Sequence, residues 1–477
     1  MTTHISEQAQ STRHEVFNPA SGEVVGHVDW STPEQVNAAV EAAAGAYPDW
    51  SGRPVKERAQ VMFRLKQVIE SSLDELSELC SAENGKTVAE SKAGILKGVE
   101  VVEYAASLPQ LIAGQYLEVS RGVSCRTVRD PLGVAASITP FNFPVMVPLW
   151  MIPLALGCGN TLVHKPSEHV PLSAVRLREY LLEAGLPGDA CRVVHGGRQA
   201  VETLVENPAV RAIGFVGSSR VAEIVYRRAT SLNKRVLALG GAKNHLVLLP
   251  DADPEASARN IVDSFTGCCG QRCMAASVLL AVGGAQEMIS AVAEKARRIL
   301  PGRDMGPVIS AEALKKITAY IDQAQADGAE VLVDGREAGP PAGGEKGFWI
   351  GPTVLDRVTP EMSVAREEIF GPVLSVIRVS TVEEALAVER ASEYGNAAAV
   401  YTQNGFLARR CIDSFNSSMI GVNIGVPVPR EPFSFGGRNR SRFGYGDITG
   451  AGAIEFWTQT RKITERWSPR KDADWMS

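Results

Sequence analysis

One long stretch of this sequence contains no charged residue, and it limits the folds that the chain can adopt. Between Asp130 and Lys165 there is no Asp, Glu, Lys or Arg, so these residues must be buried in a protein core or in a membrane. A membrane-spanning helix needs about 20 mostly apolar residues, and the prolines at 140, 144, 148 and 153 would interrupt a helix of that length. We therefore expect a buried strand, a proline-rich turn over the functional site, and a core helix that ends at Leu156.

Short β-type runs alternate with helical segments along the rest of the chain. Two strands are expected within 15–29, a helix from Thr32, and further helices within 55–80. Strands are then expected at 134–138, 161–163, 193–194, 212–215, 246–249, 277–282, 330–333, 374–379 and 397–401, with helices at 171–184, 198–206, 219–230, 254–266, 285–299, 311–327 and 382–391. This alternation predicts doubly wound α/β units, in which ligands gather at the carboxyl ends of the strands.

Charge and cysteine usage exclude some classes of protein. The net charge of −5 gives no basic field for nucleic acid. The N-terminus, Met1-Thr-Thr-His-Ile-Ser-Glu-Gln8, is polar and lacks the layout of a secretory signal, and no membrane contact is expected. Eight cysteines in 477 residues do not form a disulfide framework. These features predict a cytoplasmic protein.

Cys273 is the candidate nucleophile. It follows Gly270-Gln-Arg272, and small residues dominate the flanks, so a ligand can approach the sulfur closely. A thiolate is the reactive form, and Arg272 would help to hold its charge. The alternative is a buried, inert cysteine, which is the commoner outcome for a lone cysteine. Cys268 and Cys269 lie nearby, but the chain has no pair of Cys-x-x-Cys units, and no metal site is expected.

Two nucleotide-binding patterns fail in this sequence. Glu83-Asn-Gly-Lys-Thr87 superficially matches the end of a phosphate-binding loop, but the leading glycine of that motif is replaced by Cys80. No G-x-G-x-x-G fingerprint opens the first α/β unit. Dinucleotide binding is therefore not predicted from either motif.

Five motifs together resemble those of the aldehyde dehydrogenase superfamily. In order they are Ile138-Thr-Pro-Phe-Asn-Phe-Pro144, Lys165-Pro-Ser-Glu168, Gly214-Phe-Val-Gly-Ser218, Gly270-Gln-Arg-Cys273 and Glu367-Glu-Ile-Phe-Gly-Pro-Val373. The resemblance implies the superfamily's α/β fold, with two doubly wound domains and a β oligomerisation arm. It places the NAD-binding domain at 1–118 and 132–241, the catalytic domain at 242–445, and the oligomerisation strands at 119–131 and 446–477. The alternating segment 454–467 is expected to be an exposed strand that pairs with a neighbouring subunit.

The resemblance also implies roles for particular residues. Cys273 would attack an aldehyde carbon, and the Asn142 side chain with the Cys273 backbone N–H would stabilise the oxyanion. Lys165 and Glu168 would hold the adenosine ribose, where a carboxylate repels a 2′-phosphate and favours NAD over NADP. Glu368 and Phe370 would meet the nicotinamide ribose and ring. The full set of cofactor-binding residues is Thr139, Pro140, Phe141, Lys165, Ser167, Glu168, Gly217, Ser218, Glu368 and Phe370.

One expected residue is absent. Most members of the superfamily carry a glutamate that activates the hydrolytic water, but here Leu239, or Ala238 in the other alignment, stands at that position. Neither side chain can take a proton. With Gly241-Ala-Lys-Asn-His245, this gap resembles the CoA-acylating methylmalonate-semialdehyde dehydrogenase branch, in which CoA replaces water as the acyl acceptor.

The same branch implies a contact for the substrate carboxylate. Arg272 matches the arginine that holds it, because a guanidinium fork suits a carboxylate. Lys97 aligns with a second arginine of the branch and keeps the charge without the fork. Malonate or methylmalonate semialdehyde would then be oxidised, decarboxylated and transferred to CoA, giving acetyl-CoA or propionyl-CoA.

Two alternatives remain open on the sequence. A hydrolytic NAD-dependent aldehyde dehydrogenase for another carboxylated aldehyde would need a different base, and CoA dependence separates the two activities. A non-enzymatic role for the same fold would leave Cys273 without a use. The expected partners are a small-molecule aldehyde and CoA, and the expected assembly is a homo-oligomer, a dimer of dimers that forms a homotetramer.

Overall fold

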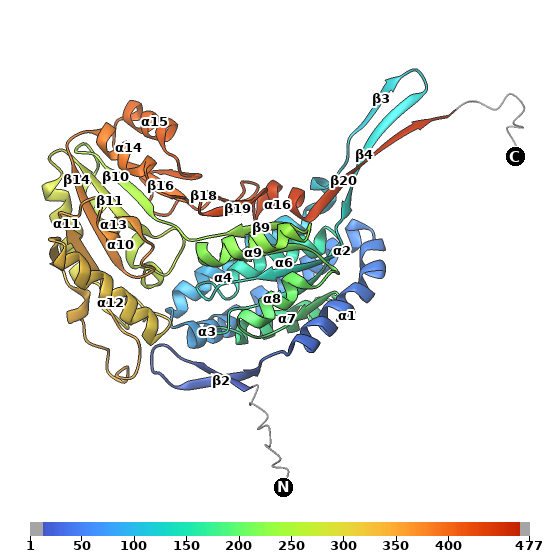
Figure 1. The fold of residues 1–477 in the computed structure, drawn as a ribbon, viewed down its shortest axis with the longest axis horizontal. Helices are drawn as coiled ribbons and strands as arrows, with labels where there is room; N and C mark the ends of the chain where they lie inside the picture. Colours follow the sequence, from blue (N-terminus) through green and yellow to red (C-terminus); the bar gives the residue numbers. More distant parts are fainter. Residues whose placement is uncertain (1–12, 468–477) are drawn as a thin grey trace, which may run out of the picture.

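The computed structural model describes residues 13–467, which form two α/β units and a projecting β arm (Figure 1). Residues 1–12 and 468–477 lie outside the described residues. The polar N-terminal segment and the two ends of the predicted domain ranges 1–118 and 446–477 therefore receive no structural account. No helix in the described part of the chain is long and apolar enough to cross a membrane.

The N-terminal region forms a hairpin followed by helices, as the sequence predicts. Strands β1 (Arg13–Phe17) and β2 (Val24–Asp29) pair antiparallel. Thr32 caps the next helix through a reciprocal pair of hydrogen bonds with Gln35. The helices of this region are α1 (Pro33–Gly52), α2 (Val55–Ser71), α3 (Leu73–Asn84), α4 (Val88–Ala106) and α5 (Leu108–Leu111).

The first sheet has the strand order β19–β9–β8–β5–β6–β7, and it is parallel except for its edge strand β19. One face is covered by α1, α8 and α9, and the other by α2, α4, α6 and α7. Its elements are β5 (Val134–Ile138), β6 (Thr161–Lys165), α7 (Leu172–Glu183), β7 (Cys191–Val193), α8 (Arg198–Glu206), β8 (Val210–Val216), α9 (Ser219–Ser231), β9 (Arg235–Leu239) and β19 (Arg442–Gly444). The strands and helices expected in this range are all present.

The uncharged stretch lies at the centre of this unit. Strand β5 runs between β8 and β6, and helix α6 (Met146–Gly157) has every residue buried. The chain between them, residues 139–145, is the expected proline-containing turn. It leaves β5 at its carboxyl end, where parallel sheets bind ligands. The prediction of a strand, a turn and a core helix is confirmed.

The second sheet has the strand order β12–β13–β14–β11–β10–β16–β17, in which only the β12–β13 pair is antiparallel. Helices α10 and α11 cover one face, and α12 to α15 cover the other. The elements are β10 (Asn244–Leu248), α10 (Pro254–Thr266), β11 (Ala276–Val282), α11 (Gln286–Arg297), α12 (Ala311–Ala326), β12 (Glu330–Val333), β13 (Thr353–Asp356), α13 (Ser363–Arg366), β14 (Val373–Val379), α14 (Val382–Arg390), β16 (Ala397–Tyr401), α15 (Gly405–Ser414) and β17 (Met419–Val422). A short antiparallel pair, β15 (Tyr394–Gly395) and β18 (Arg438–Asn439), lies beside it.

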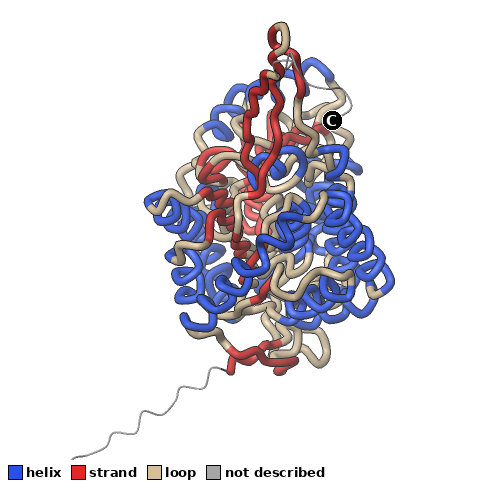
Figure 2. The backbone as a smooth tube through the Cα atoms, turned by 90° about the vertical axis from the view of Figure 1, so that its right-hand side faces the viewer, coloured by secondary structure: helices blue, strands red, loops and turns tan. Residues whose placement is uncertain are grey.

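The arm is a three-stranded antiparallel sheet that projects from the body (Figures 1 and 2). Its strands are β3 (Tyr116–Ser120), β4 (Val123–Pro131) and β20 (Thr458–Arg466). The prediction of one strand over 454–467 is wrong at its start, because residues up to Trp457 belong to helix α16 (Gly450–Trp457). Ile454, Phe456 and Trp457 are buried in the core of the first unit, so burial and not strand alternation explains their apolar character.

Asn160 offers a test of how this core is held together. Its side chain is fully buried, donates to the carbonyls of Ala155 (3.0 Å) and Trp457 (2.9 Å), and accepts from the backbone N–H groups of Leu132 (2.7 Å) and Gly133 (3.3 Å). Asn160→Ala leaves these buried groups unpaired, so we expect a loss of about 3 kcal/mol or more in the free energy of unfolding.

The measurement is urea denaturation at a fixed protein concentration. The matched control is Asn37→Ala, which removes one partly exposed hydrogen bond to Asn207 (2.8 Å) and should cost about 1 kcal/mol. Equal losses for the two variants would contradict the role given to Asn160.

Candidate active site

Cys273 lies in a strained turn between helix α10 and strand β11. The turn begins with the short 3₁₀ segment Gly267–Gly270, in which Cys268 and Cys269 have φ of 53° and 52°. Non-glycine residues rarely adopt this left-handed conformation, and strain of this kind persists only where the surrounding structure holds it. Gly270 (φ +66°) is required here, since a Cβ would lie 2.1 Å from the carbonyl oxygen of Gly371. The turn and the loop at Gly371 are therefore in close backbone contact.

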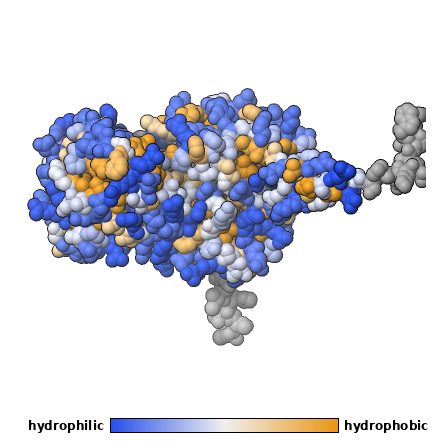
Figure 3. All heavy atoms as spheres, turned by 90° about the horizontal axis from the view of Figure 1, so that it is seen from above, coloured by the Kyte–Doolittle hydropathy of each residue, from blue (hydrophilic) through white to orange (hydrophobic). Residues whose placement is uncertain are grey.

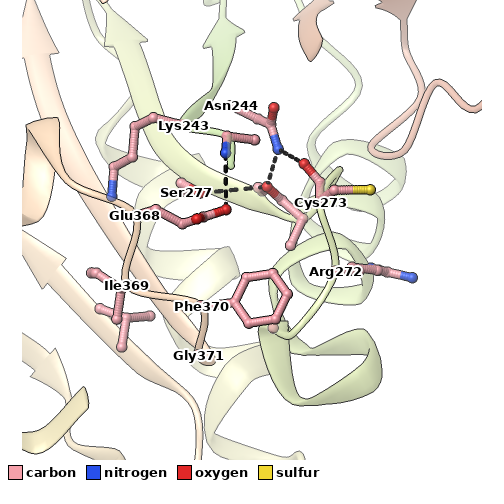
Figure 4. A pocket seen from close by; sticks show the side chains of 14 residues that line it. Lys243, Asn244, Arg272, Cys273, Ser277, Glu368, Ile369, Phe370 and Gly371 are labelled. Atoms are coloured by element: carbon pink, nitrogen blue, oxygen red, sulfur yellow. Dashed lines mark hydrogen bonds between the residues drawn. The ribbon is translucent and has the colours of Figure 1, made fainter. Parts of the chain in front are cut away.

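Two asparagines hold the backbone of Cys273, the candidate nucleophile, in place. Asn244 Nδ2 donates to the carbonyl oxygens of Cys273 and Ala275, and Asn396 Nδ2 donates to that of Cys273, each at 2.8 Å. Asn244 Oδ1 in turn accepts the N–H of Ala397 at 3.1 Å. Figure 4 shows the Asn244 amide directed at the Cys273 carbonyl. Sequence reasoning missed both residues.

The environment of the thiol opposes its ionisation. Burial raises the pKa of Cys273 to about 12, and the negative charge of Glu368 adds to the rise. A backbone hydrogen bond and the charge of Arg272 act in the opposite direction. The thiol is therefore protonated near neutral pH in the free protein, and it must be deprotonated before it can attack a carbon atom.

Arg272 is already engaged by the protein. Its Nη2 donates to the carbonyl oxygens of Ser264 (3.0 Å) and Asp263 at the end of α10. Its Nε is buried and has no partner within residues 13–467. In Figure 4 the Arg272 side chain and the Cys273 sulfur extend to the same side, away from Lys243 and Glu368. The predicted carboxylate-binding residue thus carries a buried N–H that no group of the described residues accepts.

Lys97 lies on helix α4 and is paired with acidic side chains. Its Nζ is 2.5 Å from Glu100 Oε2 and 3.8 Å from Glu431 Oε2. Burial raises the pKa of Glu431, while the charge of Lys97 opposes that rise. In the structure Lys97 therefore serves as a counter-ion for two carboxylates, and no contact joins it to Arg272 within the described residues.

The turn that carries Asn142 is fixed from outside by residues that sequence reasoning did not identify. Asn142 is buried, with 4% of its surface exposed. Asn84 Nδ2 donates to the carbonyl oxygen of Phe141 at 2.8 Å, and Lys86 Nζ donates to that of Asn142. The Phe141 ring lies edge-on to the Phe370 ring, with centroids 5.8 Å apart. The turn thus packs between the α3–α4 junction on one side and the loop at Phe370 on the other.

A deep cleft runs along the carboxyl ends of β5, β6 and β8. Its volume is about 1080 Å³, and the N-terminus of helix α9 lines it. Eight of the ten predicted cofactor-binding residues line this cleft: Thr139, Pro140, Phe141, Lys165, Ser167, Glu168, Gly217 and Ser218. The residues predicted from three separate motifs are therefore brought together.

Lys165 and Glu168 form an ion pair in this cleft, with Nζ and Oε2 3.3 Å apart. Burial alone would raise the pKa of Glu168. The charge of Lys165 and hydrogen bonds have a larger combined effect, so the pKa of that carboxyl is lowered. Burial lowers the pKa of Lys165, and Glu168 opposes the change. Glu168 is therefore ionised near neutral pH and can accept hydrogen bonds from a ribose while repelling a phosphate.

Glu368 and Phe370 line a small cavity next to Cys273 instead of the large cleft. Glu368 Oε1 accepts the N–H of Ala242 at 2.9 Å, and a Cβ on Gly241 would lie 2.2 Å from Glu368 Oε2. Burial raises the pKa of Glu368. Phe370 has a φ of 61°, a second strained position at the site.

Lys243 lines the same cavity and was also missed by sequence reasoning. It is buried, and its Nζ has no hydrogen-bond partner within residues 13–467. Burial lowers its pKa to about 7, although Glu368 and Glu367 oppose this change. A partly neutral lysine therefore lies beside the carboxyl of Glu368.

The position expected for a hydrolytic glutamate carries no ionisable group. Leu239 is the last residue of β9, and both it and Ala238 are buried among apolar side chains. No group of His, Cys, Asp and Glu side chains suited to a metal ion is present in the described part of the chain. The chemistry of the site therefore depends on the thiol, the amide donors and the ligands that the cleft holds.

Comparison with known proteins gives concordant results over almost the whole chain. A model described as the aldehyde dehydrogenase family matches residues 5–463. A malonate-semialdehyde dehydrogenase of Pseudomonas aeruginosa is 44% identical over 465 residues, covering 96% of this chain and 93% of the relative.

Two solved structures superpose with a TM-score of 0.95 each. One is a methylmalonate-semialdehyde dehydrogenase of Oceanimonas doudoroffii (41% identity, covering 98% of this chain and 97% of that chain). The other is a protein of Sinorhizobium meliloti assigned to the same activity and solved with NAD (39% identity, 98% and 96% covered).

The raised pKa of Cys273 can be tested by alkylation. The pKa of Cys273, about 12, lies above the pH range of an ordinary assay. The thiolate fraction of Cys273 should therefore rise about tenfold per pH unit between about pH 6 and pH 9. The rate of modification by iodoacetamide, followed on the Cys273 peptide by mass spectrometry, should rise in parallel without a plateau. The peptide that carries Cys125, which is partly exposed on the arm, controls for reagent decay. A plateau near pH 7 would contradict the assignment.

Proposed function

Because the chain belongs to the aldehyde dehydrogenase family, we propose that it catalyses the NAD-dependent, CoA-acylating oxidation of malonate or methylmalonate semialdehyde. The observation that carries this proposal is that the Gly270-Gln-Arg-Cys273 motif is present while neither position 238 nor position 239 carries a carboxylate. It is supported by relatives of nearly equal length whose names state the same semialdehydes. The acyl group passes from the aldehyde to Cys273 and then to CoA.

The large cleft fits NAD as a cofactor. It has room for a dinucleotide, it contains the Lys165–Glu168 pair, and the N-terminus of α9 provides N–H groups that suit a pyrophosphate. The ionised Glu168 accepts hydrogen bonds from the ribose and disfavours a 2′-phosphate, so NAD is preferred over NADP. When bound, NAD supplies the hydride acceptor.

Cys273 and Asn142 carry the first half of the reaction. The Cys273 thiol gives up its proton to solvent, and the resulting thiolate bonds to the aldehyde carbon. The electron pair of the carbonyl π bond moves to the oxygen, which becomes an oxyanion that the Asn142 amide and the Cys273 N–H stabilise. Loss of hydride from that carbon leaves a thioester on Cys273. The fixed carbonyl of Cys273 keeps its N–H and its sulfur in register during both steps.

The second half transfers the acyl group to CoA. Leu239 and Ala238 cannot activate water, so the thioester persists until a thiol attacks it. A β-carboxylate of the acyl group can leave as CO₂, because the adjacent thioester carbonyl accepts its electron pair as an enolate. Protonation of that enolate and transfer to CoA give acetyl-CoA from malonate semialdehyde and propionyl-CoA from methylmalonate semialdehyde.

Arg272 is the contact that we assign to the substrate carboxylate. Its Nε is buried and has no partner among residues 13–467, its side chain lies on the same side as the Cys273 sulfur, and a guanidinium suits a carboxylate. Lys97 contributes less than the arginine of the related branch, because Glu100 and Glu431 already neutralise it.

One observation favours the hydrolytic alternative. Glu368 is a buried carboxyl with a raised pKa that lines the same cavity as Cys273, and a group of that kind can act as a general base. In that case the product would be a free acid, and the rate would not depend on CoA.

The arm supports a homo-oligomer, which we propose to be a dimer of dimers. Tyr116, Leu117 and Val119 of β3 are 71%, 66% and 50% exposed. Apolar side chains are visible on the arm from above (Figure 3). A subunit edge that covers them would remove an aggregation hazard.

The two α/β units have separate proposed roles: the first binds NAD, and the second carries the nucleophile. Eight free cysteines agree with a cytoplasmic location.

The CoA requirement tests the proposed function. Without CoA, mixing the protein with NAD and malonate semialdehyde should give a burst of about one NADH per competent site, followed by slow turnover, because the acyl-enzyme accumulates. With CoA, turnover should continue and acetyl-CoA should form. Cys273→Ala should give no burst while it still binds NAD, and Cys268→Ala should retain the burst. Fast release of free acid without CoA would overturn the proposal in favour of hydrolysis.

The role of Arg272 is tested by comparing two aldehydes. Arg272→Leu removes a charged hydrogen-bond donor, so KM for malonate semialdehyde should rise by about tenfold to a hundredfold. KM for propanal, which has no carboxylate, should change far less. Steady-state NADH formation with CoA present measures both. An equal change for the two aldehydes would show that Arg272 acts on the fold of the turn and not on the substrate.

A further inference from the structure

The segment Glu83–Glu90 includes the stretch Glu83–Thr87, which superficially matches the end of a phosphate loop but lacks the leading glycine of that motif. It spans the junction of helices α3 and α4, and three of its polar side chains are buried. Glu83, Asn84 and Lys86 are 0%, 3% and 7% exposed. Buried polar groups of this kind are retained where they satisfy other buried polar groups. The partners of these three residues and of Glu90 belong to two turns and to the start of one helix around the proposed active site.

The first partner is the turn that carries Asn142. Residues 139–145 lie between β5 and α6, and two of them are prolines without an N–H, so few backbone donors are available nearby. Asn84 supplies a donor to the Phe141 carbonyl at 2.8 Å, and Lys86 supplies one to the Asn142 carbonyl. The Lys86 ammonium also lies over the Phe143 ring, 3.5 Å from its centroid. Two successive peptides of the turn are thus held from the same segment.

The second partner is the turn that carries Cys273. Glu90 Oε1 accepts the N–H of Cys268 at 2.6 Å, and Glu90 Oε2 accepts the N–H of Thr87 at 3.1 Å. Cys268 begins the pair of residues with positive φ, so this bond supports the strained backbone that leads to the nucleophile. The segment therefore contacts both the turn that carries Asn142 and the turn that carries Cys273.

The third partner is the helix that follows the Lys165–His169 loop. The Glu83 carboxylate accepts the N–H groups of Leu172 (2.7 Å) and Ser173 (3.0 Å) at the start of α7. The segment itself is tightly packed. Gly85 has a φ of 84°, and a Cβ on it would lie 2.9 Å from Pro307. A rigid turn of this kind can transmit a fixed geometry to the loops it holds.

We propose that Asn84 and Lys86 are positioning residues for the attack of Cys273 on the aldehyde. They hold the peptides at Phe141 and Asn142 so that the Asn142 amide faces the oxyanion that forms at Cys273. Glu90 holds the sulfur-bearing turn against the same segment, which keeps the two halves of the oxyanion site in register. This inference rests on the proposed function, because Asn142 is a donor only if an oxyanion forms.

The test is a double-mutant cycle between Lys86 and Asn142. Lys86→Met should slow single-turnover NADH formation by about a hundredfold, because a misplacement of about 1 Å costs that much. The Kd for NAD should change less than about twofold, since Lys86 does not line the NAD cleft. In an Asn142→Ala background, Lys86→Met should slow the reaction by less than about threefold, because the residue through which it acts is gone.

The matched control is Lys234→Met. Lys234 is another buried lysine whose Nζ donates to a backbone carbonyl, that of Asn207, and it follows the C-terminal end of α9. It should leave the single-turnover rate within about twofold of the unmodified protein. If Lys86→Met does not fold, as judged by thermal unfolding, Asn84→Ala replaces it in the same cycle, with an expected loss of about tenfold.

The outcomes separate this inference from the proposed function. If the unmodified protein forms no NADH from the semialdehyde, the proposed function is overturned and the inference with it. If the unmodified protein is active but the Lys86 and Asn142 effects multiply independently, Lys86 and Asn84 do not act through Asn142, and the inference alone is overturned. A Lys86→Met variant as fast as Lys234→Met would overturn it as well.

Discussion

The burial of the uncharged segment between Asp130 and Lys165 is the constraint on which the rest of the structure depends. Strand β5 is central in its sheet, and helix α6 is buried along its whole length, so both ends of the turn between them are fixed. The turn must leave the sheet at the carboxyl edge, and its carbonyls need partners there. Asn84 and Lys86 supply those partners. Burial of apolar surface thus decides where Asn142 stands.

The surroundings of Cys273, the proposed nucleophile, combine backbone strain with desolvation of the sulfur. Cys268, Cys269 and Phe370 have positive φ, and burial raises the pKa of Cys273. These costs are offset by hydrogen bonds that Asn244, Asn396 and Glu90 make to the backbone around the sulfur. Strain concentrated at a functional site and supported by its neighbours is a common feature of preorganised sites.

Sequence reasoning identified the features that local sequence patterns determine. It missed the residues that reach the site only through tertiary contacts. The β–α alternation follows from periodicity, and the residues that line the large cleft follow from the motifs of the family resemblance. Asn244 and Asn396 are 29 and 123 residues from Cys273 and meet it only because β10 and β16 are neighbouring parallel strands. The alternating segment from residue 454 predicts a strand, but its apolar residues pack into the core as the end of α16. The carbonyls at the end of α10 that hold Arg272 leave no sequence signal.

The absence of a carboxylate at Leu239 is the central feature of the proposed mechanism. Without a general base to activate water, the proposed thioester on Cys273 is not hydrolysed and persists until CoA reacts with it. Mass spectrometry of the intact protein, after mixing with NAD and malonate semialdehyde without CoA, tests this claim most directly. We expect a persistent acetyl adduct that maps to the Cys273 peptide and disappears when CoA is added. An unmodified Cys273 peptide alongside stoichiometric free acid would contradict the account.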